Sequence, residues 1–201
     1  MCHRVTPLLI SELDEALDAL HETGHARIPP RDPSIVVPDA YPGKQLPLFL
    51  PDGQGGLVTA TLTWGFPSPQ GPSAKLVFNT RLDTALSQAR SGRGLWSQAI
   101  LSGRCLVPVR AFFESYTRSP ERRRSEVRFT YPGHQVFLLA GIYQDDRVSV
   151  VTTEPNASVA PIHSRMPLVL GPGESAAWLG GDFGRLADRA GIRLDAALAG
   201  E

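Results

Sequence analysis

The sequence contains few cysteines, few lysines and no long hydrophobic run. Its two cysteines, Cys2 and Cys105, are too few for a disulfide framework. No positively charged and then apolar leader precedes the acidic segment from Ser11 to Glu22. No stretch reaches the roughly 18 uninterrupted apolar residues typical of a membrane span. These absences predict a cytoplasmic protein that makes no contact with a membrane.

The charged residues balance. Lys+Arg and Asp+Glu number 20 each, so no overall field attracts nucleic acid, and a polyanion has to bind at a local patch. Lysine occurs only at positions 44 and 75, so arginine supplies almost all positive charge. This usage suits forked contacts with phosphate, and it is equally typical of a GC-rich genome. A chain of 201 residues that is 42% hydrophobic favours a single domain over residues 1–201.

Hydrophobic spacing predicts the secondary structure. Apolar residues from Ile10 to Leu20 recur at helical spacing, with Ser11 as N-cap and Gly24 as the stop. Residues 28–56 are rich in Pro, Asp and Gly and predict a long surface excursion with one or two short strands. We expect strands at 58–64, 74–79, 106–113, 126–131, 135–143 and 147–153, short helices at 84–90 and 95–101, and two short helices after residue 174.

The last three predicted strands are separated by Pro132-Gly133 and Asp145-Asp146, which predicts an antiparallel meander. There is no regular alternation of strands and helices, and no glycine-rich phosphate loop follows a strand. The expected fold class is therefore α+β, with a mostly antiparallel, strongly curved or barrel-like sheet and a few peripheral helices.

The N-terminus carries the most unusual chemistry. Removal of Met1 gives Cys2 a free α-amine beside its thiol. The reference pKa values of these groups lie near 8 and 8.5, so both are partly nucleophilic near neutral pH. Together they can capture one aldehyde, first as an imine and then as a five-membered thiazolidine. Such a nucleophile needs an acid or base and a substrate grip from elsewhere in the chain.

One pattern favours a different chemistry. The run from His21 to His25 fits the H-E-x-x-H template of zinc peptidases. Gly24 lies inside the motif, where the helix has to continue, and Pro29-Pro30 follow within about one turn. We therefore interpret the two histidines as a solvated helix end, and we expect no metal.

Three further segments carry candidate functional groups. Asn79-Thr80-Arg81 places an amide and a guanidinium where a strand is predicted to end. The apolar run that follows Arg104 delivers Glu114 at its end, and partial desolvation of such a carboxyl raises its pKa and suits a proton carrier. His163 and Arg165 share one face if their segment is extended. Each segment alone is also consistent with an ordinary structural role.

The order of these segments resembles the SOS response-associated peptidase family, whose SRAP domain shields abasic sites in single-stranded DNA. The matching segments are Met1-Cys2-His3-Arg4, Trp64-Gly65-Phe66-Pro67, Asn79-Thr80-Arg81, Arg104 to Glu114, Ala140 to Tyr143, Thr152-Thr153 and His163 to Pro167. The resemblance covers roughly residues 1 to 179, and it is the combination of segments that is specific.

The resemblance implies that the protein removes its own Met1 and that Cys2 then forms a thiazolidine cross-link with the sugar aldehyde of an abasic site. It implies that Glu114 carries protons, Asn79 orients the Cys2 amine or a sugar oxygen, and His163 assists opening of the sugar ring. Arg4, Arg81 and Arg165 are implied to hold phosphates, and Trp64 to stack on a neighbouring base. No cofactor is implied, and we expect a monomer.

Two residues depart from the family pattern. His3 replaces a glycine beside the nucleophile, and Ser115 replaces the aromatic residue after the glutamate. His3 either narrows the pocket and blocks removal of Met1 or adds a base. The alternative functions are a non-reactive member that only binds single-stranded DNA, a thiol peptidase acting on other proteins, and a zinc peptidase.

Overall fold

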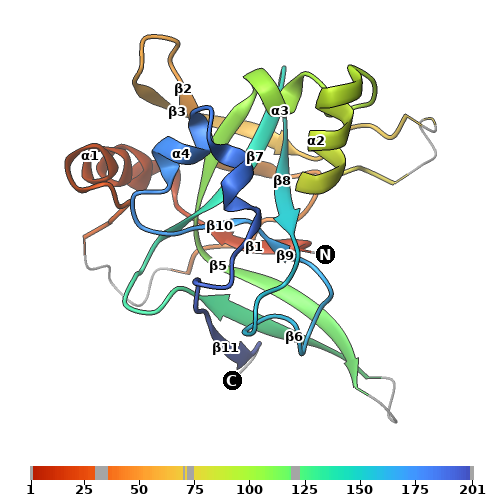
Figure 1. Cartoon of the computed structure of the whole chain (residues 1–201). Coiled ribbons are helices and arrows are strands. Elements are labelled where there is room, and N and C mark those ends of the chain that lie inside the picture. Colours follow the sequence, from red (N-terminus) through yellow and green to blue (C-terminus); the bar gives the residue numbers. More distant parts are fainter. Residues whose placement is uncertain (1, 30–35, 70, 72–74, 119–122, 200–201) are drawn as a thin grey trace.

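The computed structural model describes residues 2–29, 36–69, 71, 75–118 and 123–199, and its strands form one large sheet (Figure 1). Short helices and 3-10 turns lie at the edges of this sheet. In chain order the elements are β1 (Arg4–Pro7), η1 (Ile10–Glu12), α1 (Leu13–Thr23), β2 (Gln45–Pro51), β3 (Leu57–Trp64), β4 (Asn79–Arg81), α2 (Leu82–Ser91), α3 (Ala99–Ser102), β5 (Arg104–Arg118), β6 (Arg123–Thr130), β7 (Phe137–Gln144), β8 (Arg147–Thr153), β9 (Met166–Pro167), β10 (Val169–Leu170), α4 (Ser175–Leu179), η2 (Phe183–Ala187) and β11 (Asp195–Leu198).

The sheet curves back on itself. Its hydrogen-bonded order is β10-β7-β8-β3-β2-β5-β6-β11, and an additional pairing of β7 with β5 closes a ring of β5, β7, β8, β3 and β2. Strand β8 pairs in parallel with β3 and β4, whereas the other described ladders are antiparallel. The predicted α+β class with a mostly antiparallel, strongly curved sheet is confirmed, although the ring is not a clean barrel because β6 and β11 extend beyond it.

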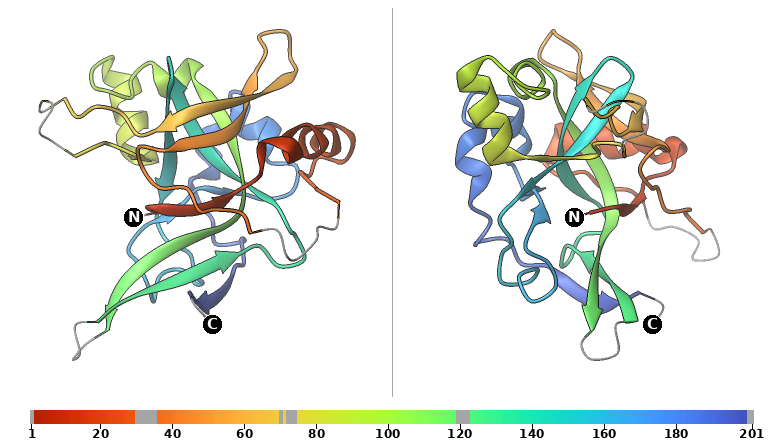
Figure 2. Two further views of the ribbon diagram at one scale, coloured as in Figure 1. Left: turned by 180° about the vertical axis from the view of Figure 1, so that it is seen from behind. Right: turned by 90° about the vertical axis from the view of Figure 1, so that its right-hand side faces the viewer.

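Strand β5 is the longest strand and links the ring to this extension (Figure 2). Its first half pairs with β7, from Arg104–Ile142 to Val109–Phe137. Its second half pairs with β6, from Phe112–Phe129 onward. The expected meander is therefore wrong at Pro132-Gly133, because β6 and β7 pair with different halves of β5 rather than with each other, whereas the β7–β8 hairpin forms as predicted.

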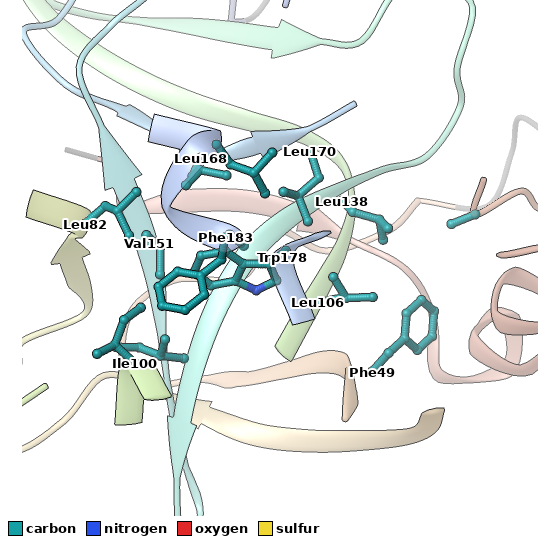
Figure 3. Packing of buried hydrophobic residues seen from close by; sticks show 14 of the residues in the cluster. Phe49, Leu82, Ile100, Leu106, Leu138, Val151, Leu168, Leu170, Trp178 and Phe183 are labelled. Carbon is teal, nitrogen blue, oxygen red and sulfur yellow. The ribbon is translucent and has the colours of Figure 1, made fainter. Parts of the chain in front are cut away.

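Hydrophobic residues pack on both faces of the sheet. Along β5, Leu106 joins one cluster, whereas Cys105 and Val107 join the other, as expected for side chains that alternate across a strand. The first cluster also contains the buried residues of the helices, among them Trp178 (Figure 3). The second cluster contains Cys2 and Val5 of the N-terminal segment. The side chains of Cys2 and Val5 therefore point to the face of the sheet that these helices do not cover.

Several predicted boundaries shift. The α-helix begins at Leu13, after a 3-10 turn, rather than at Ser11, and it ends as predicted at Gly24, which adopts a φ of 72°. Glu114 lies inside β5 rather than at its end, because pairing with β6 continues the strand to Arg118. The predicted strand 74–79 begins outside the described residues, and within them β4 starts only at Asn79.

The C-terminal tail completes the sheet. Strand β11 was not predicted, and it pairs with β6 from Asp195–Thr130 to Leu198–Val127. The predicted pair of short helices around Gly180 corresponds to α4 and η2. None of the helices in the described ranges is long and apolar enough to cross a bilayer.

Arg104 fastens the tail to the ring. Its guanidinium lies 4.2 Å from the centroid of the Phe183 ring, and it donates hydrogen bonds to five backbone carbonyls. These carbonyls belong to Ile100, Leu101, Trp178, Leu179 and Gly180. Only arginine combines so many donors in one planar group. One side chain therefore holds the C-terminal ends of α3 and α4 together.

We expect Arg104→Lys to lower the free energy of unfolding by about 2 kcal/mol, because a lysine cannot satisfy five carbonyls that are partly removed from water. Urea denaturation followed by tryptophan fluorescence measures the change. Arg90→Lys, at an exposed position of α2, is the matched control and should shift the midpoint little. Equal midpoints for the two variants would contradict the role assigned to Arg104.

Candidate functional site

Cys2 lies directly before β1, and the pairing of β1 with β5 holds it in place. The ladder joins Arg4 to Phe113 and Val5 to Phe112. The Cys2 side chain is buried, and its Sγ lies 3.6 Å from the carbonyl oxygen of Arg4. Burial, reinforced by the charge of Glu114, raises the pKa of the thiol well above its usual range. The thiol is therefore protonated at neutral pH in this structure.

Glu114 supplies a buried carboxyl group on β5. Its side chain has no exposed surface, and burial raises its pKa to about 7. The charge of Glu114 acts on the thiol of Cys2, so the two groups belong to one electrostatic environment. A carboxyl with a pKa near 7 can both donate and accept a proton at neutral pH.

Asn79, the first residue of β4, contacts the same segment. The parallel pairing of Asn79 with Val150 fixes its backbone. Its Nδ2 donates a hydrogen bond of 2.7 Å to the carbonyl oxygen of Cys2. Its buried Oδ1 forms no hydrogen bond with any described residue, which leaves an acceptor directed at no partner within the described chain. Buried acceptors of this kind are usually satisfied, so an N–H or O–H of a bound molecule fits here.

His163 lies in the loop between β8 and β9. Its Nδ1 is 3.0 Å from both the backbone nitrogen and the backbone oxygen of Arg165. Burial lowers its pKa, so the ring is neutral at neutral pH. The neighbouring residues Ile162 and Met166 pack in the same hydrophobic cluster as Cys2, which places this loop on the Cys2 side of the sheet.

The three predicted phosphate-binding arginines all form ion pairs. Arg4 contacts two carboxylates, Asp39 and Glu126, each at 2.6 Å. Arg81 binds Asp83 at 2.9 Å. Arg165 binds Glu154 and lies 3.5 Å from Asp83. A phosphate that reaches these guanidinium groups therefore competes with carboxylates already in place.

The Phe113 ring also holds Arg4 in place, because the guanidinium carbon lies over this ring, 4.0 Å from its centroid. The Arg4 partners Asp39 and Glu126 lie 35 and 122 residues away along the chain. No local spacing or motif connects residues so far apart, so sequence reasoning missed both carboxylates.

Trp64 is buried, whereas the role implied by the family resemblance requires an exposed ring. It has no exposed surface, its Nε1 donates to the carbonyl oxygen of Phe78 at 2.8 Å, and its ring meets the Phe78 ring edge to face. A ring enclosed in this way offers no face to a base. The stacking role expected of Trp64 is therefore corrected to a packing role.

The two residues that depart from the family pattern lie next to the same ion pairs. Nε2 of His3 is 2.9 Å from Oε1 of Glu126. Ser115 lies opposite Glu126 in the β5–β6 ladder. Glu126 therefore holds both His3 and Arg4, and the imidazole at position 3 has a partner in this structure.

The histidines of the His21–His25 motif do not lie on one continuous helix. Helix α1 ends at Thr23, and Gly24 turns into the left-handed region before His25. The ring of His25 instead lies 6.0 Å from that of His134. Among the described residues, no group of three His, Cys, Asp or Glu side chains could hold a metal ion. The motif is a helix end, as the sequence predicted.

A thiol at the second residue, a buried carboxyl and a buried amide lie together at the N-terminal strand, which defines a candidate site around Cys2. The chain belongs to the SOS response-associated peptidase (SRAP) family, whose family model matches residues 1–191. Abasic site processing proteins YoqW and YoaM of Bacillus subtilis (strain 168) are each 24% identical to it over 188 residues. Each alignment covers 89% of this chain, and it covers 80% of YoqW and 79% of YoaM.

Solved structures share the fold. A phage-related protein from Bordetella bronchiseptica superposes with a TM-score of 0.67 at 20% identity, covering all of this chain and 95% of its own. A second protein from that organism gives a TM-score of 0.66 at 20% identity, covering 98% of this chain and 99% of its own. The ring-like sheet is therefore shared by proteins whose sequences have largely diverged.

The buried carboxyl predicts a pH-dependent stability. The pKa of Glu114 is about 7 in the folded protein and 4.5 in the unfolded chain. Between these pH values the folded state holds a proton that the unfolded chain releases. The free energy of unfolding should therefore fall as pH rises from about 4.5 to about 7. Glu114→Gln should match the parent protein below this window and exceed its stability by about 3 kcal/mol above it.

Urea denaturation at pH 4.5, 6 and 8 measures this difference. Glu15→Gln, which alters an exposed carboxyl of α1, is the matched control and should follow the parent protein at all three values. A constant offset between Glu114→Gln and the parent at every pH would contradict a raised pKa for Glu114.

Proposed function

We propose that this protein processes abasic sites in single-stranded DNA and that Cys2 forms a covalent thiazolidine with the sugar aldehyde after Met1 is removed. The observation that carries the proposal is the meeting of Cys2, Asn79 and Glu114 in one buried environment, from positions far apart in the chain. Family membership and the names of the relatives support the DNA lesion as the substrate.

The reaction begins at the amino terminus. Hydrolysis of the Met1–Cys2 peptide bond consumes one water and frees the α-amine of Cys2. This amine adds to the aldehyde carbon of the ring-opened sugar, and the resulting carbinolamine loses one water to give an imine. The imine nitrogen keeps its own hydrogen and is protonated at this stage. The thiol sulfur then adds to the same carbon, the thiol proton passes to the Glu114 carboxylate, and the thiazolidine ring closes.

Glu114 is suited to move the protons of these steps. In its neutral form it protonates the departing hydroxyl of the carbinolamine, and as the carboxylate it then accepts the proton of the Cys2 thiol. Its pKa of about 7 makes both forms available at neutral pH. The buried surroundings exclude bulk water, which favours the imine over its hydrolysis.

Asn79 and His163 are proposed to position the reactants. Oδ1 of Asn79 is available to accept a hydrogen bond from the freed amine or from a sugar hydroxyl. The backbone of Arg165 orients the His163 ring through Nδ1, and the lowered pKa of this ring keeps it neutral and suited to assist opening of the sugar. No cofactor takes part in this scheme.

The arginines are proposed to bind the DNA backbone by exchange. Phosphates flanking the lesion replace the carboxylates that now hold Arg4, Arg81 and Arg165. This exchange makes binding weaken with salt, as expected wherever phosphates are neutralised. We further propose that the protein acts in the cytoplasm and as a monomer.

A second candidate function is a family member that binds single-stranded DNA without reacting. The observation that favours it is the thiol itself, which is buried and protonated here. His3 adds to this argument, because it stands where the family has glycine and a larger side chain there can block removal of Met1. A zinc peptidase draws no support from the geometry described above, since the histidine motif ends its helix.

The first test is covalent capture. Incubation with an oligonucleotide that carries one abasic site should give a heat-stable adduct, seen by denaturing electrophoresis and intact mass, in protein that has lost Met1. Cys2→Ala should abolish the adduct completely because both nucleophiles are needed for the ring. Cys105→Ala removes the other buried thiol and should react as the parent protein does. An adduct that survives in Cys2→Ala would refute the proposal, and its absence from every protein would leave the binding function.

The second test follows the rate of adduct formation against pH. If loss of water from the carbinolamine limits the rate, the rate should fall as pH rises through about 7, where Glu114 loses its proton. Glu114→Gln should lower the rate by about 100-fold and remove this inflection. Glu15→Gln should keep both the rate and the inflection. An unchanged inflection in Glu114→Gln would assign the titration to another group.

A further inference from the structure

Tyr41 is unusual among the aromatic residues of this protein. The chain has three tryptophans, four tyrosines and eight phenylalanines. All of them are described, and only Tyr41 is exposed, with 44% of its surface accessible. A single exposed side chain is ordinary in itself, so a partner is indicated only by where this ring lies and by what accompanies it.

A rigid turn presents this side chain. The backbone nitrogen of Lys44 donates to the carbonyl oxygen of Tyr41 at 3.0 Å. Pro42 and Gly43 occupy the two central positions, and Gly43 has a φ of 88°. This arrangement is typical of a type II turn, in which proline fixes the first central residue and glycine tolerates the positive φ of the second. Tyr41 and Lys44 therefore occupy the two ends of one preformed turn.

The turn lies beside the Cys2 site. Val5 and Ala40 exchange both backbone hydrogen bonds, at 3.1 and 2.8 Å, in an antiparallel bridge. Because the bridge is antiparallel, the residues after Ala40 run back along those before Val5, toward Cys2. The segment that precedes β2 runs beside β1 near the N-terminus (Figure 2). Tyr41 also lies within electrostatic range of the Arg4 guanidinium.

A second contact ties the turn to the other side of the site. The backbone nitrogen of Gly43 donates to the carbonyl oxygen of Trp64 at 2.7 Å. Trp64 in turn donates to the carbonyl oxygen of Phe78, the residue before Asn79. The turn is therefore held between the strand that follows Cys2 and the segment that leads to Asn79.

Charge distinguishes Lys44 from the arginines of the site. Arg4, Arg81 and Arg165 each bind a carboxylate, whereas the exposed Lys44 forms no ion pair with any described residue. A phosphate can reach its ammonium group without displacing another anion. An exposed ring and an unpaired cation on one turn are the combination that binds single-stranded nucleic acid, through base stacking and backbone contact.

We propose that Tyr41 stacks on a base next to the abasic sugar and that Lys44 binds a phosphate of the same nucleotide. This inference deepens the proposed function and rests on it for the identity of the lesion. A strand that lacks one base loses stacking on both sides of the gap. An aromatic ring at the rim of the site replaces the lost stacking for one of the neighbouring bases. Holding this base in place also positions the adjacent abasic sugar next to Cys2.

The experiment measures adduct formation against oligonucleotide concentration for the parent protein and for variants of the turn. Tyr41→Ala should raise the concentration that gives half the maximal rate by about tenfold and leave the maximal rate unchanged, because stacking affects binding rather than chemistry. Tyr41→Phe keeps the ring and should behave as the parent does. Leu101→Ala, which truncates an exposed apolar residue of α3, is the control for surface truncation.

A substrate change tests the contact directly. When the nucleotides on both sides of the lesion are replaced by tetrahydrofuran spacers, which carry no base and cannot open to an aldehyde, Tyr41→Ala and the parent protein should react equally, because nothing remains to stack. Lys44→Met should reduce the salt dependence of binding by about 0.7 in log–log slope, the value for one phosphate on a single strand, whereas Lys44→Arg should keep it.

Equilibrium binding of an intact single-stranded oligonucleotide distinguishes failure of the covalent function from failure of the stacking role of Tyr41. If no adduct forms but Tyr41→Ala weakens this binding about tenfold while Tyr41→Phe does not, the covalent function fails and the role of Tyr41 stands. If the Cys2-dependent adduct forms and Tyr41→Ala matches the parent protein in both assays, the covalent function stands and the role of Tyr41 is refuted. A tenfold loss that persists when the flanking bases are absent also refutes stacking.

Discussion

The pairing of β1 with β5 is the constraint on which the site depends. Chain termini usually fray, because few contacts hold them. Here the ladder from Arg4–Phe113 to Pro7–Val109 fixes the first strand against the longest strand of the sheet. The Asn79 side chain adds a bond to the carbonyl of Cys2. A residue next to the chain end thereby acquires the fixed position that a reacting group needs, and Glu114 shares its environment because it lies on the same β5.

Burial at this position has two opposite effects. It raises the pKa of Glu114 into the range where the group can exchange protons at neutral pH. It also raises the pKa of the Cys2 thiol, which keeps the thiol protonated. Desolvation is the main cause of both shifts, so a more exposed site would lower both pKa values together. A mechanism in which the thiol gives up its proton only to the neighbouring carboxylate reconciles them, since that step needs no free thiolate in solution.

The sequence predicted the parts of this protein that local pattern determines. Alternating apolar residues predicted the hairpin of β7 and β8, and Gly24 predicted the end of α1. Glu114 was recognised because an apolar run leads to it, although the run does not show that β6 extends the strand beyond it. Burial of Trp64 depends on Phe78 and on the ring closure, which involve contacts that are distant in sequence. The partners of Arg4 were missed for the same reason, since their positions follow from the folded sheet rather than from any motif.

Electrostatic neutrality is a local property of the site as well as a property of the whole chain. The three arginines face Asp39, Glu126, Asp83 and Glu154, so their charges are compensated before any ligand arrives. Compensation holds each guanidinium in a defined place, which reduces the entropy that is lost when a phosphate binds. It also weakens long-range attraction of a polyanion, so encounter has to depend on short-range contacts. The exposed ring of Tyr41 and Lys44, which has no ion pair with any described residue, are proposed to provide such contacts, because neither has to release a partner first. Under this proposal, selection of a damaged strand depends on the shape and chemistry of the lesion more than on its charge.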